Sequence, residues 1–431
     1  MAIDKVSFRK VGVTLYEGVA KSGIKYVLAP IAGLKTKVFG VMVGKGGLDD
    51  VERIGNTRIP AGSAHLLEHR MFQMAQGDGA QLLLAQGASS NAFTDRSSTF
   101  YYFSTVDDWK APLNTLWDMV THFYMSEERV EREKDIVIGE LEGLLDNPAY
   151  LFQKEVSQAL YSVSPLKDLI IGTPETIKQI HMSTLKKFFL AFYGLKDMVL
   201  FGTGGFDPEE VVKELDGQKP VNDFTMLETY RVDSSKEDHA SVRQGFVKAP
   251  SPDGQTYLGV GIKFPTRKEL FDKYGDSIFT IYELLPELVF SPILAPIDRM
   301  KKDGLAIFEA GSSLEEGGED AFLDILYETN SPAKLKERLE EHLAKPQNAL
   351  DPFFGELRSL KSDYFGDALA VAGAPFPLID SLVDSFQNHF AWPALAESVL
   401  SVNRHDAEKF LKDLSGWPRS YVLLTGKEGK R

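Results

Sequence analysis

Five consecutive residues of the chain, His65-Leu66-Leu67-Glu68-His69, combine two imidazoles with a carboxylate. On a helix, His65 and His69 lie one turn apart on the same face, so both rings can reach one metal ion. Glu68 lies beside that face, where it can approach a water on the metal without being a ligand. Taken alone, the histidines can equally be ordinary core or surface residues. The pattern therefore indicates a metal-activated hydrolytic site if a further ligand exists.

The further ligand has to come from another part of the chain, because catalytic zinc sites usually combine three protein ligands with one open position. The chain contains no cysteine, which excludes thiolate ligands, a cysteine nucleophile and disulfides. The best candidate segment is VEREKDIVIGELEGLLDNP, in which Glu133 and Glu140 are separated by two helical turns and share a face. An acidic helix is ordinarily solvated, so Glu140 becomes a candidate ligand only in combination with the histidine pair.

These motifs together resemble the pitrilysin/insulinase family of zinc peptidases, whose inverzincin signature is H-x-x-E-H. Glu140 follows His69 by 71 positions, as the resemblance requires. The segment NAFTDRSSTFYYF resembles the family's Asn-Ala-x-Thr segment and the strand after it, and GTPETIKQI resembles a helix start of the family. The resemblance covers nearly all of the first half of the chain and is only architectural in the second.

The resemblance implies a role for each matching position. The implied roles are zinc ligand (His65, His69 and Glu140), general base (Glu68), supporting carboxylate (Glu133) and substrate binding by strand addition (Asn91 and Ala92). Strand addition is physically sensible, because backbone pairing binds many peptide sequences alike. Two simpler alternatives stay open, namely an ion pair of Glu68 with Arg70 or another base and a turn role for Asn91.

Several elements must position these residues. Alternating or β-rich runs predict strands at 24–31, 37–44 and 99–106. Helical patterns lie between and after them, including the helix of the histidine pair, for which Ser63 is a plausible N-cap. The helix of Glu133 and Glu140 is expected over 126–145 and ends at Asp146-Asn147-Pro148.

A weak internal repeat suggests how the chain is organised. Residues 185–204 align with 407–426 at an offset of 222, and both copies read as helix, glycine turn and apolar strand. We therefore expect an α+β fold of two related domains, each a mainly antiparallel sheet packed by helices. The family resemblance implies that these domains form one half of a processing-peptidase-like clamshell. The predicted boundaries are an N-terminal metal-binding catalytic domain over 1–225, a linker over 226–242, and a C-terminal non-catalytic repeat domain over 243–431. The counterpart of Glu68 would lie near Phe290, where there is no similar His and Glu pair.

The composition is that of an ordinary globular protein, with 431 residues of which 43% are hydrophobic. A net charge of −14 argues against nucleic-acid binding. No apolar run is long enough to span a membrane, and the first residues do not resemble a secretory signal. These features, together with the absence of cysteine, lead us to expect a cytoplasmic protein without a membrane partner.

The expected function is that of a zinc metalloendopeptidase, which hydrolyses oligopeptides or unfolded segments in an enclosed chamber. Family members often carry an arginine and a tyrosine near a Gly-Leu-Ala-Tyr segment; here Arg299 is present but Ile307 replaces the tyrosine. We therefore expect a heterodimer with a second half-size homologue, and a homodimer as the alternative. Two other functions stay open: a non-catalytic or processing scaffold subunit, and a structural zinc protein.

Overall fold

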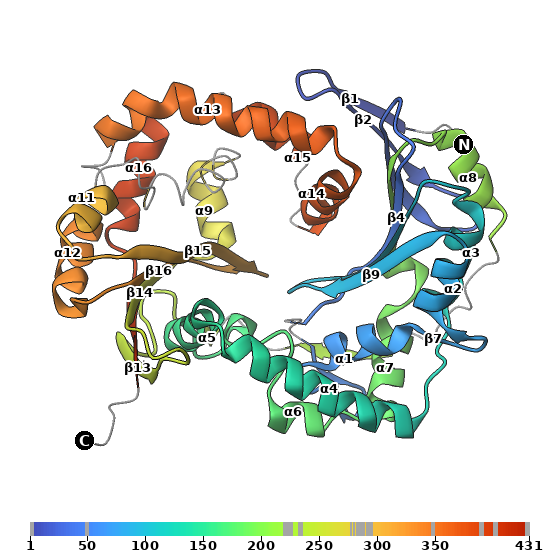
Figure 1. The fold of residues 1–431 in the computed structure, drawn as a ribbon, viewed down its shortest axis with the longest axis horizontal. Helices are drawn as coiled ribbons and strands as arrows, with labels where there is room; N and C mark the ends of the chain where they lie inside the picture. Colours follow the sequence, from blue (N-terminus) through green and yellow to red (C-terminus); the bar gives the residue numbers. More distant parts are fainter. Residues whose placement is uncertain are drawn as a thin grey trace. The chain divides into compact units, whose positions relative to one another are not determined.

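The computed structural model describes residues 4–47, 51–218, 227–231, 236–275, 278, 281, 289, 296–345, 350–387, 392–399 and 404–426. Contacts group the chain into two compact units. The first unit comprises Met1–Ile138, Leu169–Arg231 and Tyr364–Glu397, and the second comprises Gly139–Asp168, Val232–Asp363 and Ser398–Arg431. Each unit is built on its own sheet, so each is described separately below (Figure 1).

The first unit contains a seven-stranded sheet in which only the pair β3·β11 is parallel. In spatial order the strands are β1 (Asp4–Phe8), β2 (Val13–Val19), β3 (Lys25–Pro30), β11 (Met198–Gly204), β4 (Lys37–Val43), β10 (Thr99–Thr105) and β9 (Ala88–Thr94). Short strands form two small additional sheets: β5 (Val51–Ile54), β6 (Thr57–Arg58) and β12 (Thr229–Arg231), and β7 (Gln73–Met74) with β8 (Gly77–Asp78). The strands predicted at 24–31, 37–44 and 99–106 are thus β3, β4 and β10.

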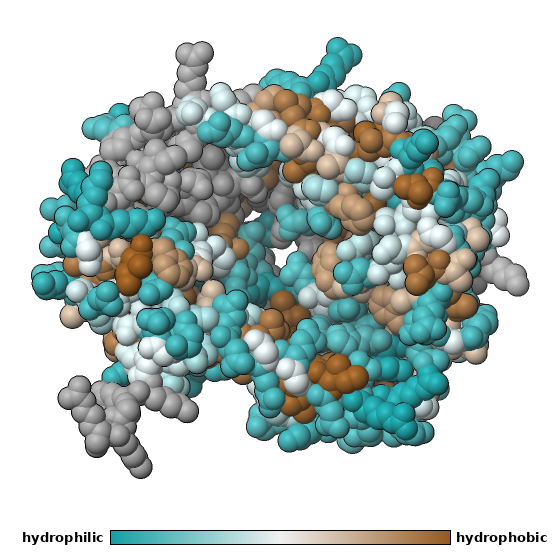
Figure 2. Space-filling view, viewed as in Figure 1, coloured by the Kyte–Doolittle hydropathy of each residue, from teal (hydrophilic) through white to brown (hydrophobic). Residues whose placement is uncertain are grey.

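Helices of the first unit lie along and beside this sheet (Figure 1). They are α1 (Ser63–Met71), α2 (Gly79–Ala85), α3 (Lys110–Thr121), α4 (Glu127–Leu145), α6 (Pro174–Lys178), α7 (Met182–Phe192), α8 (Pro208–Asp216), α14 (Pro375–Gln387) and α15 (Trp392–Ser398), with the 3₁₀ turn η2 (Leu195–Asp197). Helix α4 continues seven residues past the boundary between the units, which falls between Ile138 and Gly139. Figure 2 shows that hydrophilic side chains cover most of the visible surface over α4 and α6, as expected for amphipathic helices.

The second unit contains a five-stranded sheet in which only β13·β17 is parallel. In spatial order the strands are β13 (Phe246–Pro250), β17 (Arg419–Thr425), β14 (Tyr257–Lys263), β16 (Asp320–Glu328) and β15 (Phe308–Gly317). Its helices are α5 (Pro148–Leu160), α9 (Arg267–Tyr274), α11 (Pro296–Lys302), α12 (Pro332–Ala344), α13 (Leu350–Ala372) and α16 (Arg404–Leu414), with the 3₁₀ turn η1 (Pro165–Lys167). Helix α13 extends into the segment grouped with the first unit, which begins at Tyr364.

The two sheets repeat one topology, which agrees with the duplication inferred from the sequence. The order β3-β11-β4-β10-β9 corresponds strand for strand to β13-β17-β14-β16-β15, including the single parallel pair. Helix α7 begins at Met182 and α16 at Arg404, an offset of 222 residues. Phe188 and Phe410, which the alignment pairs, are both buried. The α+β fold of two related, mainly antiparallel domains is therefore confirmed.

The grouping of helices differs from the contiguous halves drawn from the sequence. Every strand of the five-stranded sheet lies after residue 243, and every strand of the seven-stranded sheet lies before 225. However, α5 packs on the second sheet, where Phe152 fills the space beside Gly259, and α14 packs on the first, where Leu378 and Leu382 join its core. A helical pattern shows which face of a helix is apolar but not which sheet receives it.

The predicted linker, 226–242, falls partly outside the described residues. Its described end is built into the second unit, because the Glu237 carboxylate accepts backbone N–H bonds from Ser162, Val163 and Ser164. The buried Lys263 ammonium donates to Glu237 at 2.6 Å. No single described helix is long and apolar enough to cross a membrane, although one sharply bent pair, Lys361–Ala372 with Pro375–Phe386, reaches that length and hydropathy together.

Candidate active site and metal centre

Helix α1 carries His65, Glu68 and His69 and begins at Ser63. The prediction that Ser63 is the N-cap is wrong. The N-cap is Gly62 at φ 90°, and the Ser63 hydroxyl donates instead to the carbonyl of Pro60 at 2.6 Å. The left-handed conformation at the cap favours glycine, which explains why a capping side chain is not used at this helix start.

The start of α1 is packed backbone to backbone against the loop that precedes α6. A Cβ at Gly62 would lie 2.5 Å from the carbonyl oxygen of Ile171, and a Cβ at Gly172 would lie 2.6 Å from that of Ala61. Gly172 also has a positive φ of 85°. The next residue, Thr173, caps α6 through a capping box with Thr176. The Gly-Thr segment quoted from the sequence thus fixes the position of the histidine helix.

The two histidines lie on one face of α1, with ring centroids 4.7 Å apart. Both side chains are half-buried. Burial, together with the nearby His69, lowers the pKa of His65 to about 4. The His65 imidazole is therefore neutral at pH 7, which is the form that binds a metal.

Glu140 is brought to this pair by helix α4. The face of α4 that packs into the protein carries Val130, Val137 and Leu141, all buried. Glu140 lies next to this stripe and is exposed. Glu140 belongs to the second unit but lies only two residues past the boundary between the units. Helix α4 is uninterrupted there, so the helix itself carries Glu140 toward the histidines.

One donor atom from each of His65, His69 and Glu140 lies within 4.8 Å of the others. In a tetrahedral zinc site with bonds of about 2.0–2.1 Å, two ligand atoms are about 3.3 Å apart. Two nitrogen donors and one oxygen donor are also the chemistry of a catalytic zinc site. The residues therefore fit zinc, and their roles as ligands remain predictions.

Glu133 lies two helical turns before Glu140 on the same face of α4 and contacts His69 and Arg70. Its Oε1 lies 3.1 Å from Nδ1 of His69, and its Oε2 accepts from Arg70 at 2.6 Å. The hydrogen bond to His69, followed by that to Arg70, holds the pKa of Glu133 below its usual value against the effect of burial. A charged carboxylate at Nδ1 fixes the proton on that nitrogen, so Nε2 of His69 is the atom left for a metal.

The Glu68 carboxylate is 7% exposed and lies under the site rather than on the surface. The alternative of a surface ion pair with Arg70 is not what the structure shows, because Arg70 pairs with Glu133. The Thr94 hydroxyl donates to Oε2 of Glu68 at 2.8 Å. Thr94 belongs to the quoted Asn-Ala-x-Thr segment. Its hydrogen bond to Glu68 joins β9 to α1, and the spacing of these two residues in the sequence does not predict it.

A pair of tyrosines, also not anticipated from the sequence, lies beneath Glu68. The hydroxyls of Tyr101 and Tyr193 are 2.8 Å apart and both side chains are fully buried. Burial is the main cause that raises the pKa of each phenol, and the negative charge of Glu68 contributes to both. Both phenols therefore stay neutral and form an uncharged floor to the site.

Asn91 and Ala92 lie on β9, the last strand of the seven-stranded sheet. Their partners on β10 are Tyr102 and Tyr101. Among the described residues, β9 pairs with β10 alone, so its other edge faces away from the sheet. Asn91 is consequently a strand residue and not the turn residue that was the alternative.

Of the second-half positions singled out from the sequence, Arg299 lies exposed on α11, and Ile307 is 49% exposed just before β15. Phe290, near the expected counterpart of Glu68, lies outside the described residues. Within the described residues, the His65, His69 and Glu140 group has no equivalent in the second unit.

The chain is similar to known peptidases in part of its sequence and in its fold. The family model of insulinase, peptidase family M16, matches residues 40–174. The uncharacterized zinc protease YmfH of Bacillus subtilis is 33% identical over 250 residues, which cover 56% of this chain and 58% of YmfH. The mitochondrial-processing peptidase subunit beta of Saccharomyces cerevisiae is 31% identical over 157 residues, which cover 35% of this chain and 34% of the yeast protein. The chain thus matches these relatives over about three fifths of their length or less.

A solved structure shows the same fold over almost the whole chain. A putative M16-like peptidase from Alicyclobacillus acidocaldarius superposes with a TM-score of 0.80 at 22% identity, covering 96% of this chain and 99% of that one. The H-x-x-E-H helix, residues 65–69, lies inside the segment matched by the family model, as does Glu140. Residues 40–174 therefore match the insulinase family, peptidase family M16, and almost the whole chain has the fold of an M16-like peptidase.

Proposed function

We propose that the protein is a zinc-dependent endopeptidase. The observation that carries the proposal is the convergence of His65, His69 and Glu140 to within 4.8 Å, with Glu68 on the same helix as the histidines. Two neutral imidazoles and one carboxylate would leave a bound Zn²⁺ with net positive charge and one open position. Bound there, zinc would acidify a water molecule and polarise the scissile carbonyl.

Glu68 would act as the general base and then as the acid. It would accept the proton of the attacking water and deliver it to the nitrogen of the leaving amine. Thr94 holds Oε2 of Glu68 by a hydrogen bond, which orients the carboxylate plane. The bonds of Glu133 to His69 and Arg70 orient the imidazole in the same way. No side chain becomes covalently attached to the substrate in this scheme.

The substrate would bind as an extended strand along the free edge of β9. Asn91 and Ala92 lie on this strand, and Thr94, at its end, contacts Glu68. Backbone pairing would align the peptide without regard to most of its side chains. We therefore propose oligopeptides or unfolded segments as substrates, enclosed in a chamber that excludes folded domains.

The test combines zinc analysis with hydrolysis of an internally quenched peptide, on the wild type and on Glu68→Gln. We expect one zinc per chain in both proteins and loss of hydrolysis by at least about 100-fold in the variant, since general acid–base catalysis contributes about that much. Glu142→Gln, which removes an exposed carboxylate from α4, is the matched control and should keep full activity. An active wild type without metal would refute the proposal, as would full activity of Glu68→Gln.

We further propose a heterodimer with a second homologue, and a homodimer as the alternative. Ile307 stands where the family resemblance places a tyrosine, so this chain lacks one group that a partner can supply. The relative from yeast is by name one subunit of a processing peptidase. If the purified chain alone hydrolyses peptides at the full rate of the native complex, the heterodimer is excluded, and its mass in solution then decides whether it forms a homodimer.

The second candidate function, a non-catalytic or processing scaffold subunit, is favoured by the same Ile307 substitution. It predicts that the chain binds zinc but shows no hydrolysis, alone or with its partner. A structural zinc role instead predicts that Glu68→Gln leaves every function of the protein intact. The hydrolysis experiment separates the endopeptidase from both alternatives.

A further inference from the structure

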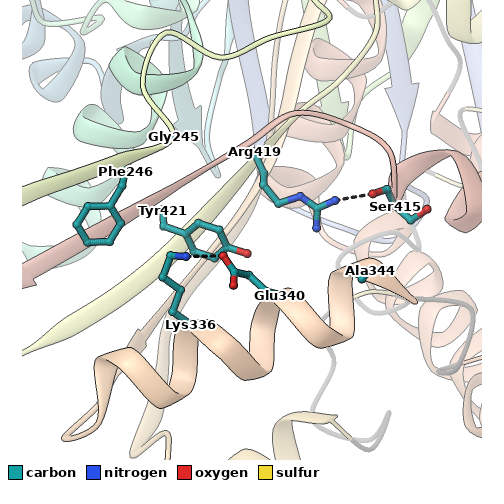
Figure 3. Close-up of a pocket in the computed structure, with 8 residues that line it drawn as sticks. All are labelled: Gly245, Phe246, Lys336, Glu340, Ala344, Ser415, Arg419 and Tyr421. Carbon is teal, nitrogen blue, oxygen red and sulfur yellow. Dashed lines mark hydrogen bonds and ion pairs between the residues drawn. The ribbon is translucent and has the colours of Figure 1, made fainter.

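The second unit contains a groove. The residues that line it are far in sequence from the histidine helix α1. Its volume is about 570 Å³. Three elements form it: the edge strand β13 with Phe246, the neighbouring strand β17 with Arg419 and Tyr421, and helix α12 with Lys336, Glu340 and Ala344 (Figure 3). None of these residues takes part in the proposed hydrolysis.

The groove exists because α12 covers only part of the sheet. The helix buries Leu335, Leu339 and Leu343, and each lining residue of α12 follows one of these leucines by one position. Phe246 is the parallel partner of Tyr421, so both side chains lie on the same face of the sheet. The Phe246 ring is 47% exposed, which leaves an apolar wall beside the edge strand.

The charges of the groove favour an anion. Lys336 forms an ion pair with Glu340 and lies over the Tyr421 ring, 4.6 Å from its centroid. The Arg419 guanidinium donates one hydrogen bond to the carbonyl of Ser415, at 2.6 Å. Because Lys336 and Glu340 neutralise one another, Arg419 leaves the groove with a net positive charge, and a guanidinium has further N–H donors to offer a carboxylate.

A buried hydroxyl provides an independent sign of a ligand. Tyr421 is only 4% exposed, and no hydrogen bond of ordinary geometry reaches its hydroxyl from the described residues, although Arg419 is close enough to interact with it. Figure 3 shows this hydroxyl directed toward the side of the groove where Arg419 lies. Buried hydroxyls normally have a partner, so an orphan beside a cationic group marks a position where an acceptor atom is expected.

We propose that this groove binds the C-terminal residue of a peptide, with its carboxylate on Arg419 and Tyr421 and its apolar side chain against Phe246 and Ala344. The main chain of such a peptide would run beside β13, which among the described residues pairs with β17 alone. The choice of a peptide as ligand rests on the proposed function. Binding itself does not, because it requires neither zinc chemistry nor turnover.

The test measures peptide binding to zinc-loaded Glu68→Gln protein, which does not consume the probe. The probe is fluorescein-labelled Ser-Gly-Ser-Gly-Leu, with a free C-terminal carboxylate or as the C-terminal amide, followed by fluorescence anisotropy. Binding along β9 is common to both peptides, so only the difference between acid and amide reports on the groove. We expect the acid to bind about tenfold more tightly, the effect of one hydrogen bond to a charged group.

Variants of the groove decide whether that preference arises there. Tyr421→Phe removes only the orphan hydroxyl, and Arg419→Gln removes the guanidinium; each should abolish most of the preference for the acid. Tyr327→Phe is the matched control, because Tyr327 on β16 also has a buried hydroxyl without a partner but does not line the groove. Equal affinity for acid and amide overturns the proposal, and so does a preference that survives both groove variants, since it would then come from the zinc site.

Discussion

Glu133→Gln provides the sharpest test of how the proposed metal centre is supported. The wild-type carboxylate accepts two hydrogen bonds, from Nδ1 of His69 at 3.1 Å and from Arg70 at 2.6 Å. A glutamine of the same shape keeps one acceptor oxygen, but its amide group brings N–H donors to a place where both neighbours are donors. One of the two bonds must therefore be lost, and the negative charge disappears with it.

The magnitude follows from these contacts. A hydrogen bond to a charged group contributes about 1.5–3 kcal/mol, and the bond to His69 strengthens when its other nitrogen binds a cation. Loss of such a supporting partner typically weakens metal binding about 10–100-fold, which is about 1.4–2.7 kcal/mol. We expect the zinc dissociation constant of Glu133→Gln to rise by that factor at pH 7.5, with a smaller effect on the activity of fully zinc-loaded protein.

The assay is competition for zinc between the protein and a chromophoric chelator at fixed pH, because proton release couples metal affinity to pH. Circular dichroism checks that each variant is folded. Glu142→Gln serves again as the control, since it removes the same charge from an exposed position on α4. If Glu133→Gln binds zinc within twofold of the wild type, or if both variants weaken zinc binding equally, then Glu133 does not support the site.

The other predictions concern the base, the helix start and the second unit. Thr94→Val should lower kcat about tenfold without changing zinc affinity, because one hydrogen bond to the Glu68 carboxylate is lost; Thr94→Ser should restore most of the rate in a steady-state peptide assay. Gly62→Ala should destabilise the protein in urea unfolding by more than about 1 kcal/mol, because φ is 90° and the new Cβ would lie 2.5 Å from the carbonyl of Ile171. The His239→Gln variant should be less stable than the wild type, and the difference should be largest at acid pH. The reason is that the hydrogen bond to Asp320, 2.6 Å long, raises the pKa of His239 above its usual value of 6.5. That contribution is fully present below pH 6.5 and is lost as the pH rises through the raised pKa, so unfolding curves at pH 5.5 and 9 should show a large and a small difference respectively.

Two outcomes would contradict this reasoning. Gly143→Ala, in the exposed last turn of α4 where a Cβ meets nothing within 4 Å, should stabilise the protein slightly, so an equal loss at Gly62 and Gly143 would show that the close approach to Ile171 is unimportant. A constant stability difference between wild type and His239→Gln across the pH range would show that charge on His239 does not contribute.

The sequence alone determined the local chemistry of the site and the repeated architecture. The spacing of His65 and His69 places them on one helical face, because the α-helix repeats every 3.6 residues. The alternating strands at 24–31, 37–44 and 99–106 were recognisable for a similar reason, since side chains of a strand alternate between its faces. The offset of 222 residues between the two copies is likewise a property of the chain, and α7 and α16 begin at that spacing.

Tertiary structure decided which distant groups meet. No local pattern distinguishes Glu140, beside the histidines, from the exposed carboxylates of the same helix, because that depends on how α4 packs through Val130 and Val137. Thr94 reaches Glu68, and Arg70 turns to Glu133, through contacts between elements that are far apart in sequence. The exchange of α5 and α14 between the halves has the same origin, since an amphipathic helix encodes an apolar face but not the sheet that will cover it.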